Sequence, residues 1–217
     1  MRRSYLLPLF ALITSAMFAQ DITLVKPPAK LGVDVLDAIR MRAAARAFVK
    51  KDLSVADLST IMWAANGLKG TPDAVSTASK AGSTIPVSGD FDYINVYALT
   101  AKGAFRYEPA GNVLKSVNAR DVRTELTPES IPTAALMVLF TVDNDKAPSF
   151  FKSNPGMFRE IADATASYGA QNVGLVTTGL RMSSIVMYNI KPDAIAADLK
   201  LSKDESPLFI MQLGYNQ

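Results

Sequence analysis

Apolar side chains recur at the spacing of an α-helix in four stretches of the chain. Ser54 and Asp57 resemble a capping box that opens the second of these stretches, and Gly67 ends it. The first stretch is rich in Ala, and the fourth starts with Pro at its first turn. The pattern therefore predicts helices over residues 33–48, 55–66, 154–180 and 192–199. The third is the longest and is expected to lie at the centre of the fold.

Short apolar runs rich in Val, Ile and Phe predict strands between these helices. The run 133–142 is almost continuously apolar, which is typical of a strand buried on both faces. The other predicted strands cover residues 94–100, 104–108, 184–190 and 208–213, with a turn at 109–112. Pro27 and Pro28 predict an extended lead-in over residues 21–31. The order of elements predicts an α+β fold with an open sheet.

The first nineteen residues have the pattern of a secretory signal peptide. Arg2 and Arg3 give a positive start, and an uncharged apolar run follows over residues 5–19. This run is shorter than the roughly 20 residues that a membrane span needs, so no stable membrane span is expected. Cleavage after Ala16 or after Ala19 suits the small residues there. We expect a signal peptide at 1–19, a domain at 20–217, and export to the periplasm or medium; a buried N-terminal helix is the alternative.

Composition excludes several kinds of chemistry. The 217 residues include no Cys and no His, which removes thiolate and His-ligated metal sites, Cys nucleophiles and Ser-His-Asp triads. The formal charge is +3. Loss of Arg2 and Arg3 with the signal peptide leaves nearly equal numbers of basic and acidic residues in the domain. Basic residues form no clustered stripe of the kind that nucleic-acid binding needs. We expect neither a metal site nor a nucleic-acid partner, and any redox chemistry requires a bound cofactor.

Five short strings, in order along the chain, resemble the nitroreductase family, and most closely its SagB-type dehydrogenases. The resemblance is carried by the Arg and Phe positions, the Trp-Ala-Ala-Asn-Gly run, the Gln-Asn pair and the Leu-Gly-Tyr string. The strings are RAAARAF at 42–48, LSVADL with IMWAANG at 53–67, TIPVSGD at 84–90, GAFRYEP at 103–109, and GAQNVGL with the later GL and LGY at 169–215. The likeness covers nearly all of the predicted domain.

This resemblance implies a nitroreductase-like α+β fold with a central, mostly antiparallel sheet flanked by helices. It also implies a homodimer whose two FMN sites lie at the interface. The implied activity is two-electron (hydride) transfer through FMN to a small organic substrate, with NAD(P)H as the candidate electron donor. Such chemistry needs little side-chain acid–base catalysis because the cofactor performs the redox step. The missing His and Cys are compatible with it, and no catalytic residue is assigned.

The resemblance places the FMN phosphate at Arg42, Ala44 and Arg46. A helix through this stretch would put Arg42 and Arg46 on one face, where both guanidinium groups could bind a phosphate. The family usually has Ser where this chain has Ala44, so one hydroxyl donor is missing. The alternative reading is two solvated arginines on an Ala-rich helix.

The resemblance also places four residues of the TIPVSGD string along the flavin ring: Pro86, Val87, Ser88 and Asp90. The family usually has Asn at the last of these positions, and an ionised Asp90 offers no amide donor. Backbone around Val186 would pack on the flavin face. The alternatives are an ordinary turn and a buried strand. A second function therefore stays open, in which the dimer has lost its flavin and serves as a binding or scaffold protein.

Overall fold

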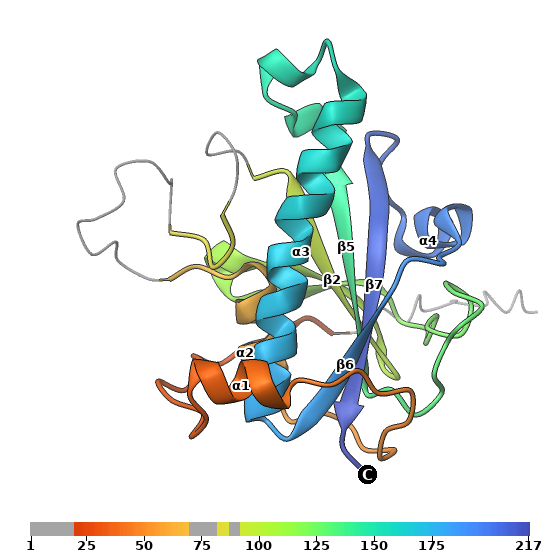
Figure 1. The fold of residues 1–217 in the computed structure, drawn as a ribbon. Helices are drawn as coiled ribbons and strands as arrows, with labels where there is room; N and C mark the ends of the chain where they lie inside the picture. The colour runs from red at the N-terminus through yellow and green to blue at the C-terminus, as the bar shows by residue number, and fades with distance from the viewer. Residues whose placement is uncertain (1–19, 70–81, 87–91) are drawn as a thin grey trace, which may run out of the picture.

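The computed structural model describes residues 20–69, 82–86 and 92–217 (Figure 1). Its strands form a seven-stranded sheet in the order β1-β4-β3-β2-β5-β7-β6, and every pairing is antiparallel. The strands are β1 (Ile22–Thr23), β2 (Ile94–Thr100), β3 (Gly103–Glu108), β4 (Val113–Asn118), β5 (Leu136–Asp143), β6 (Met182–Met187) and β7 (Glu205–Tyr215). The predicted α+β fold with a mostly antiparallel sheet is confirmed.

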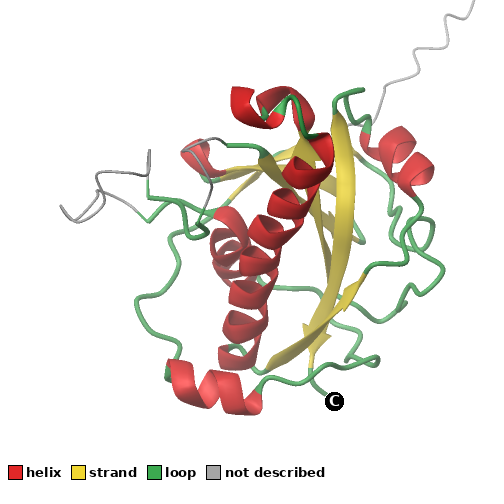
Figure 2. Cartoon of the chain, turned by 45° about the horizontal axis from the view of Figure 1, so that its top comes forward, coloured by secondary structure: helices red, strands yellow, loops and turns green. Residues whose placement is uncertain are grey.

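Helices cover both faces of this sheet. They are α1 (Val35–Met41), α2 (Val55–Asn66), α3 (Pro155–Gly179) and α4 (Pro192–Leu199). The long α3 lies along one face together with α2, and α4 lies on the other face (Figures 1 and 2). The larger apolar core fills the space between the sheet and α2 with α3, and a smaller one lies beneath α4. No helix among the described residues is long and apolar enough to cross a membrane.

Capping groups begin α2 and α3, and end α2, where the sequence predicted. The Ser54 hydroxyl accepts from the Asp57 backbone N–H at 3.0 Å, and Gly67 is the residue that ends α2. The Asn154 side chain accepts from the Met157 N–H at 3.1 Å and begins α3. Helix α3 packs closely on α2 because Gly169 has no side chain. A Cβ atom there would lie only 2.4 Å from the Ala65 carbonyl oxygen.

The predicted first helix, 33–48, is wrong over its second half. Helix α1 ends at Met41, and residue 42 has an extended ψ of 122°. The chain then runs to the end of β7, where Phe48 is buried against Gly214 and Val49 pairs with Tyr215. An extended chain covers more distance per residue than a helix. Packing of Phe48 therefore overrides the helix propensity of the alanines.

The motif residues near the C-terminus hold this crossing segment in place. A Cβ atom at Gly214 would lie 2.8 Å from the Cβ atom of Phe48, so only Gly lets the aromatic ring lie against β7. The Tyr215 hydroxyl donates to the Asp57 carboxylate at 2.6 Å. Burial, and then this bond to Asp57, raise the pKa of Tyr215 to about 12. The Leu-Gly-Tyr string thus joins β7 to α2 and to the segment after α1.

A polar network lies at one end of the sheet. One oxygen of the Glu205 carboxylate accepts from the side chains of Asn95 and Tyr97, each at 2.9 Å, and from Thr141. The Arg106 guanidinium donates to the Asn95 side-chain oxygen, Oδ1, at 2.8 Å. Burial, and then the Glu205 charge, raise the pKa of Tyr97 above its usual value, so its hydroxyl stays a donor. The network fixes four neighbouring strands relative to one another.

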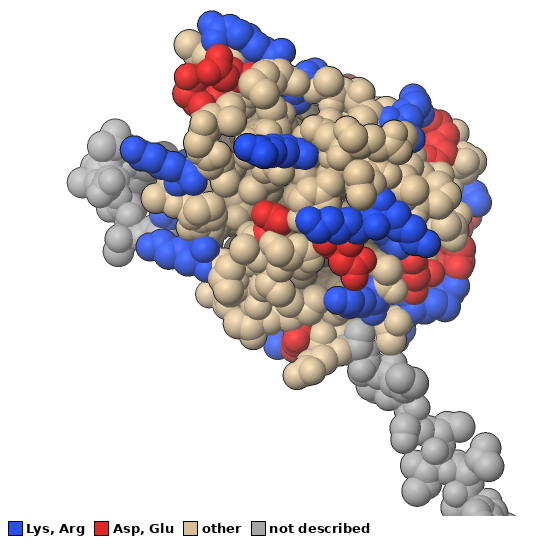
Figure 3. Space-filling view, turned by 90° about the horizontal axis from the view of Figure 1, so that it is seen from below, with Lys and Arg blue, Asp and Glu red and all other residues tan. Residues whose placement is uncertain are grey.

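Charged side chains of both signs are interspersed on the face seen from below in Figure 3. Uncharged surface separates several of them, and acidic side chains lie beside the basic ones near the centre of this face. Exposed apolar residues gather instead on α1, where Val35, Leu36, Ile39 and Met41 are each 54–62% exposed. A helix with so much exposed apolar surface is typical of an interaction site.

Candidate functional site

A cavity of about 390 Å³ lies between α3 and the edge strand β6. Its volume lies in the range of small-molecule and cofactor pockets. Among the described residues no carboxylate lines it, and Arg42 is the only charged residue of that lining. The lining residues are Arg42, Ala44, Ser167, Ala170, Gln171, Gly174, Ser184, Ile185, Val186, Tyr188 and Met211. The cavity therefore combines one cation, a few neutral polar groups and an apolar wall.

Arg42 enters this cavity across a glycine of α3. Its Cδ atom would lie 3.3 Å from a Cβ atom at Gly174, so the absence of a side chain there leaves room for the arginine stem. The Arg42 guanidinium makes no ion pair or hydrogen bond with any residue of the described ranges. A guanidinium that pairs with no described residue, in a cavity that no described carboxylate lines, favours a bound anion, and a phosphate fits its planar donors best.

Arg46 does not line the cavity. Its Nη1 atom lies 3.5 Å from the Glu129 carboxylate, and the two side chains are 68% and 40% exposed. The expectation that Arg42 and Arg46 share one helix face is wrong, because the helix ends before both of them. The structure thus separates the two arginines. Arg42 lines the cavity, and Arg46 pairs with Glu129 instead.

Strand β6 forms the opposite wall. Ser184, Ile185 and Val186 line the cavity, so the structure brings Val186 together with Arg42 and Ala44 as the resemblance implied. This strand is the last in the sheet, and its outer edge pairs with no other described strand. Backbone donors and acceptors on such an edge are available to a ligand. Tyr188 follows the strand, is 67% exposed, and packs its ring 5.4 Å from that of Phe209.

The segment expected along the flavin ring is only partly described. Pro86 is exposed and does not line the cavity. Val87, Ser88 and Asp90 lie outside the described residues. The residues before Pro86 are held firmly: Thr84 donates to the Trp63 carbonyl at 3.0 Å, and its own carbonyl accepts from the Asn172 amide at 3.1 Å. Asn172 therefore anchors this segment to α3 within one chain.

Reasoning from the sequence missed most of the α3 side of the cavity. Ser167, Ala170 and Gly174 line it, and Gln171 joins them. One signal was available, since small residues recur on one face of α3 and let other groups approach closely. Nothing in the sequence alone indicated that Tyr188 and Met211 would lie beside them.

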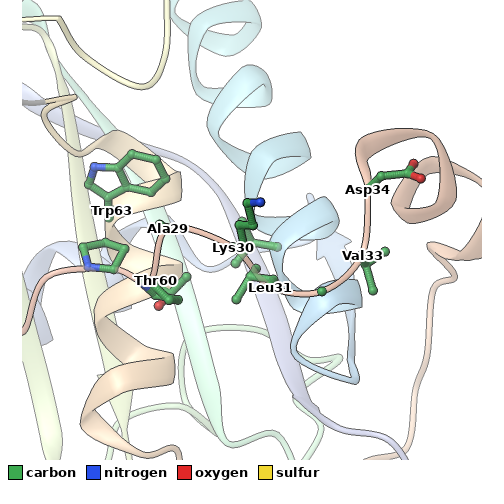
Figure 4. Close-up of a pocket in the computed structure, with 11 residues that line it drawn as sticks. Ala29, Lys30, Leu31, Val33, Asp34, Thr60 and Trp63 are labelled. Carbon is green, nitrogen blue, oxygen red and sulfur yellow. The ribbon is translucent and has the colours of Figure 1, made fainter.

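A second cavity, of about 530 Å³, lies beside α2 and the C-terminal part of α3 (Figure 4). The lead-in segment 27–34 forms one side, and Thr60 and Trp63 form the other. The Trp63 indole N–H donates to the Leu68 carbonyl at 2.8 Å, which fixes the ring. A basic and an acidic residue, Lys30 and Asp34, both line this cavity, so it suits a phosphate less well than the first.

The first cavity fits an FMN group. Arg42 supplies a cation for the phosphate, and the apolar side chains and free edge of β6 suit a planar ring. Ala44 contributes no hydroxyl, so the phosphate would depend on few donors. The structure thus places a long helix over an antiparallel sheet, with a cavity at the edge strand that suits an anionic ligand with an apolar part.

The chain belongs to the nitroreductase family, whose model matches residues 39–215. No curated protein is detectably similar to it in sequence. Many solved structures share its fold, and three of them illustrate the range of similarity. A Ralstonia eutropha JMP134 protein assigned as a nitroreductase has a TM-score of 0.79 and 24% identity, with 99% of this chain and 96% of that chain covered.

The other two structures are more distant in sequence. The microcin synthetase McbBCD complex of E. coli, with truncated pro-MccB17 bound, has a TM-score of 0.63 and 15% identity, covering 90% of this chain and 79% of that one. The NADPH:FMN oxidoreductase of Vibrio harveyi, complexed with NAD+, has a TM-score of 0.59 and 15% identity, covering 84% and 69%. Both likenesses establish the fold.

Proposed function

We propose that this protein binds FMN in the cavity between α3 and β6 and transfers electrons in pairs, as hydride, to a small organic substrate. The observation that carries the proposal is the Arg42 guanidinium, which Gly174 admits into the cavity and which pairs with no residue of the described ranges. Family membership supports it, since the fold is that of flavin oxidoreductases. Bound FMN supplies the redox chemistry.

The chain's own residues bind and orient the cofactor in this proposal. Arg42 holds the phosphate through charge-assisted hydrogen bonds. Ile185 and Val186 give the ring an apolar surface, and the edge of β6 offers backbone groups to its polar rim. Tyr188 lines the cavity and is 67% exposed, so it would border the bound cofactor on the solvent side. No acid–base residue is required of the protein.

We also propose that the active form is a homodimer through α1. Four apolar side chains of this short helix are more than half exposed, and Arg42, at the end of the helix, lines the cavity. A second copy that covers α1 would therefore also border the flavin cavity. Replacing Ile39 by Glu should give monomers in analytical ultracentrifugation and weaken FMN binding; an unchanged dimer would place the interface elsewhere.

Export remains part of the proposal and has its own basis. The first interactions of the described domain begin at Asp21, whose carboxylate accepts from Lys115 and from the Ser116 N–H, each at 2.9 Å. A cut after Ala19 would leave these contacts intact. Mass spectrometry of protein recovered from the periplasm or medium tests this, and a full-length chain in the cytoplasm alone would contradict it.

The activity is tested with the purified protein loaded with FMN. Dithionite should reduce the bound flavin, and a nitroarene such as nitrobenzoate should reoxidise it without air. NADPH is tested separately as a reductant, because an exported protein would receive its electrons from a donor other than NADPH. Reduction by dithionite followed by no reoxidation with nitroarenes or quinones would contradict the enzymatic proposal. A protein that takes up no FMN would favour the alternative, a flavin-free binding or scaffold dimer.

A further inference from the structure

The second cavity, beside α2 and the end of α3, has no part in the proposed flavin chemistry. Its volume of about 530 Å³ lies in the range of small-molecule sites. No described residue lines both this cavity and the flavin cavity. Gly174 borders the flavin cavity and Val176 the second one, and residues two apart on a helix lie on different faces. A ligand in one cavity therefore leaves the other free.

Two contacts hold the lead-in segment against this cavity. The Val25 N–H donates to the Ser59 hydroxyl of α2 at 2.9 Å. Leu31 packs at the end of α3, where a Cβ atom on Gly179 would lie 3.0 Å from the leucine Cβ atom. The backbone N–H groups of residues 29–33 donate no hydrogen bond to any described residue. The segment is thus fixed in place while its backbone donors beside the cavity stay available to a ligand.

Lys30 gives the cavity a positive charge, and it is the only basic residue among the described lining residues. Its ammonium group forms no ion pair or hydrogen bond within the described ranges. Asp34 is the only acidic residue of that lining, and its Oδ1 atom accepts from the Asp37 N–H at 2.9 Å. In Figure 4, Lys30 lies between Asp34 and the ring of Trp63. The cavity therefore offers an uncommitted cation beside an aromatic ring.

Trp63 forms an aromatic wall in a fixed orientation. The ring cannot turn without losing the hydrogen bond from its indole N–H to the Leu68 carbonyl, at 2.8 Å. Thr60, one turn earlier on α2, and Val176 on α3 extend this wall. A planar aromatic ligand gains both apolar burial and ring contacts against such a surface.

We propose that this second cavity binds a small aromatic carboxylate, with its ring on Trp63 and its carboxylate on Lys30. The free backbone N–H groups of residues 29–33 supply further donors to the carboxylate. A single negative charge suits the site better than two, because Asp34 at one end of the cavity repels negative charge. This inference does not rest on the proposed flavin function.

The test is a titration of the purified protein with phenylacetate, followed by tryptophan fluorescence. Trp63 is the only tryptophan of the chain, so its emission reports directly on this cavity. We expect a saturable change, and Lys30→Met should raise the Kd about fivefold, the upper end for an exposed ion pair. Lys26→Met is the matched control: it removes the same charge from the same segment, outside the lining, and should leave the Kd unchanged.

Phenylacetamide, which keeps the ring and lacks the charge, tests the contact with Lys30. It should bind wild type about fivefold more weakly than phenylacetate does, and should bind wild type and Lys30→Met equally. Equal Kd values of phenylacetate for wild type and Lys30→Met would overturn the proposal. So would an equal loss of affinity in Lys26→Met, or a fluorescence that phenylacetate does not change.

Equilibrium dialysis of phenylacetate with and without bound FMN separates the two cavities. The Kd should be the same in both states, and loss of binding on addition of FMN would overturn the proposal by placing the ligand in the flavin cavity. Binding by Ile39→Glu monomers alone would also overturn it, because it would show that a second copy covers the site. A protein that binds phenylacetate but takes up no FMN would refute the flavin function and support this site.

Discussion

Replacement of Gly174 by Ala should make the protein more stable and its flavin binding weaker. Gly in a helix interior costs roughly 0.5–1 kcal/mol relative to Ala, and this position lies within the 25-residue α3. The new Cβ atom would lie 3.3 Å from Arg42 Cδ and 3.8 Å from Met211 Cε. Both neighbours are flexible side chains that can move aside, so the helix keeps the gain in propensity while Arg42 is displaced.

The expected loss of affinity follows from the contact that Arg42 makes. A charge-assisted hydrogen bond contributes about 1.5–3 kcal/mol. Losing about 1.4 kcal/mol of it raises the Kd for FMN about tenfold. Urea unfolding in the absence of flavin measures the stability, and FMN fluorescence titration measures the affinity. The opposite direction of the two changes distinguishes this effect from general damage to the fold.

Gly156→Ala is the matched control for this experiment. It lies in the first turn of the same helix, where a Cβ atom meets only the Asn154 Oδ1 atom at 3.8 Å. This variant should bind FMN as wild type does. If Gly174→Ala becomes more stable and binds FMN equally well, Arg42 does not hold the flavin from the position seen here.

Three further predictions concern stability. Glu205→Ala should lower the free energy of unfolding by about 3 kcal/mol in urea unfolding, since it leaves three donors without their acceptor; a loss below about 1 kcal/mol would contradict this. Gly169→Ala should fail to fold or lose several kcal/mol by thermal unfolding, because its Cβ would overlap the Ala65 carbonyl; a wild-type Tm would refute the close packing of α2 and α3. The Ser116 N–H, and then Lys115, lower the pKa of Asp21. The ionised carboxylate therefore adds to the free energy of unfolding above the usual Asp pKa of about 3.9, and this stabilisation is lost as pH falls through the depressed pKa. The free energy of unfolding of Asp21→Asn, measured by urea unfolding at several pH values, should therefore be lower than that of wild type near neutral pH and equal to it in strong acid. A difference that does not change with pH would contradict the assignment.

Local signals in the sequence predicted the elements whose ends are set by local bonds. The bounds of β2 and α4 match the prediction, and α2 lies between its Ser54 cap and Gly67. Elements that depend on contacts between residues far apart in sequence were either not predicted or predicted too short. Strand β4 has a weak pattern of its own and exists because β3 and β1 pair with it. Strand β7 starts earlier than predicted, where Pro207 is accommodated at a shift in register opposite β5.

The candidate site shows the same division. The resemblance named Arg42, Ala44 and Val186, and these line one cavity although Val186 lies far along the chain from the other two. It could not show that Arg46 turns to Glu129, because that depends on where α1 ends and on the packing of Phe48. It also gave no reason to select Gly174, whose role is to leave space for a side chain from another element.

The most direct test of the flavin proposal is a spectroscopic titration of wild type and Arg42→Ala with FMN. The wild-type protein should take up about one FMN per chain and show a protein-bound flavin spectrum. Arg42→Ala should keep the wild-type circular dichroism spectrum and lose most of this binding, since no other charged residue of the described ranges lines the cavity. A wild-type protein that takes up no FMN, or an Arg42→Ala variant that binds it equally well, would contradict the account.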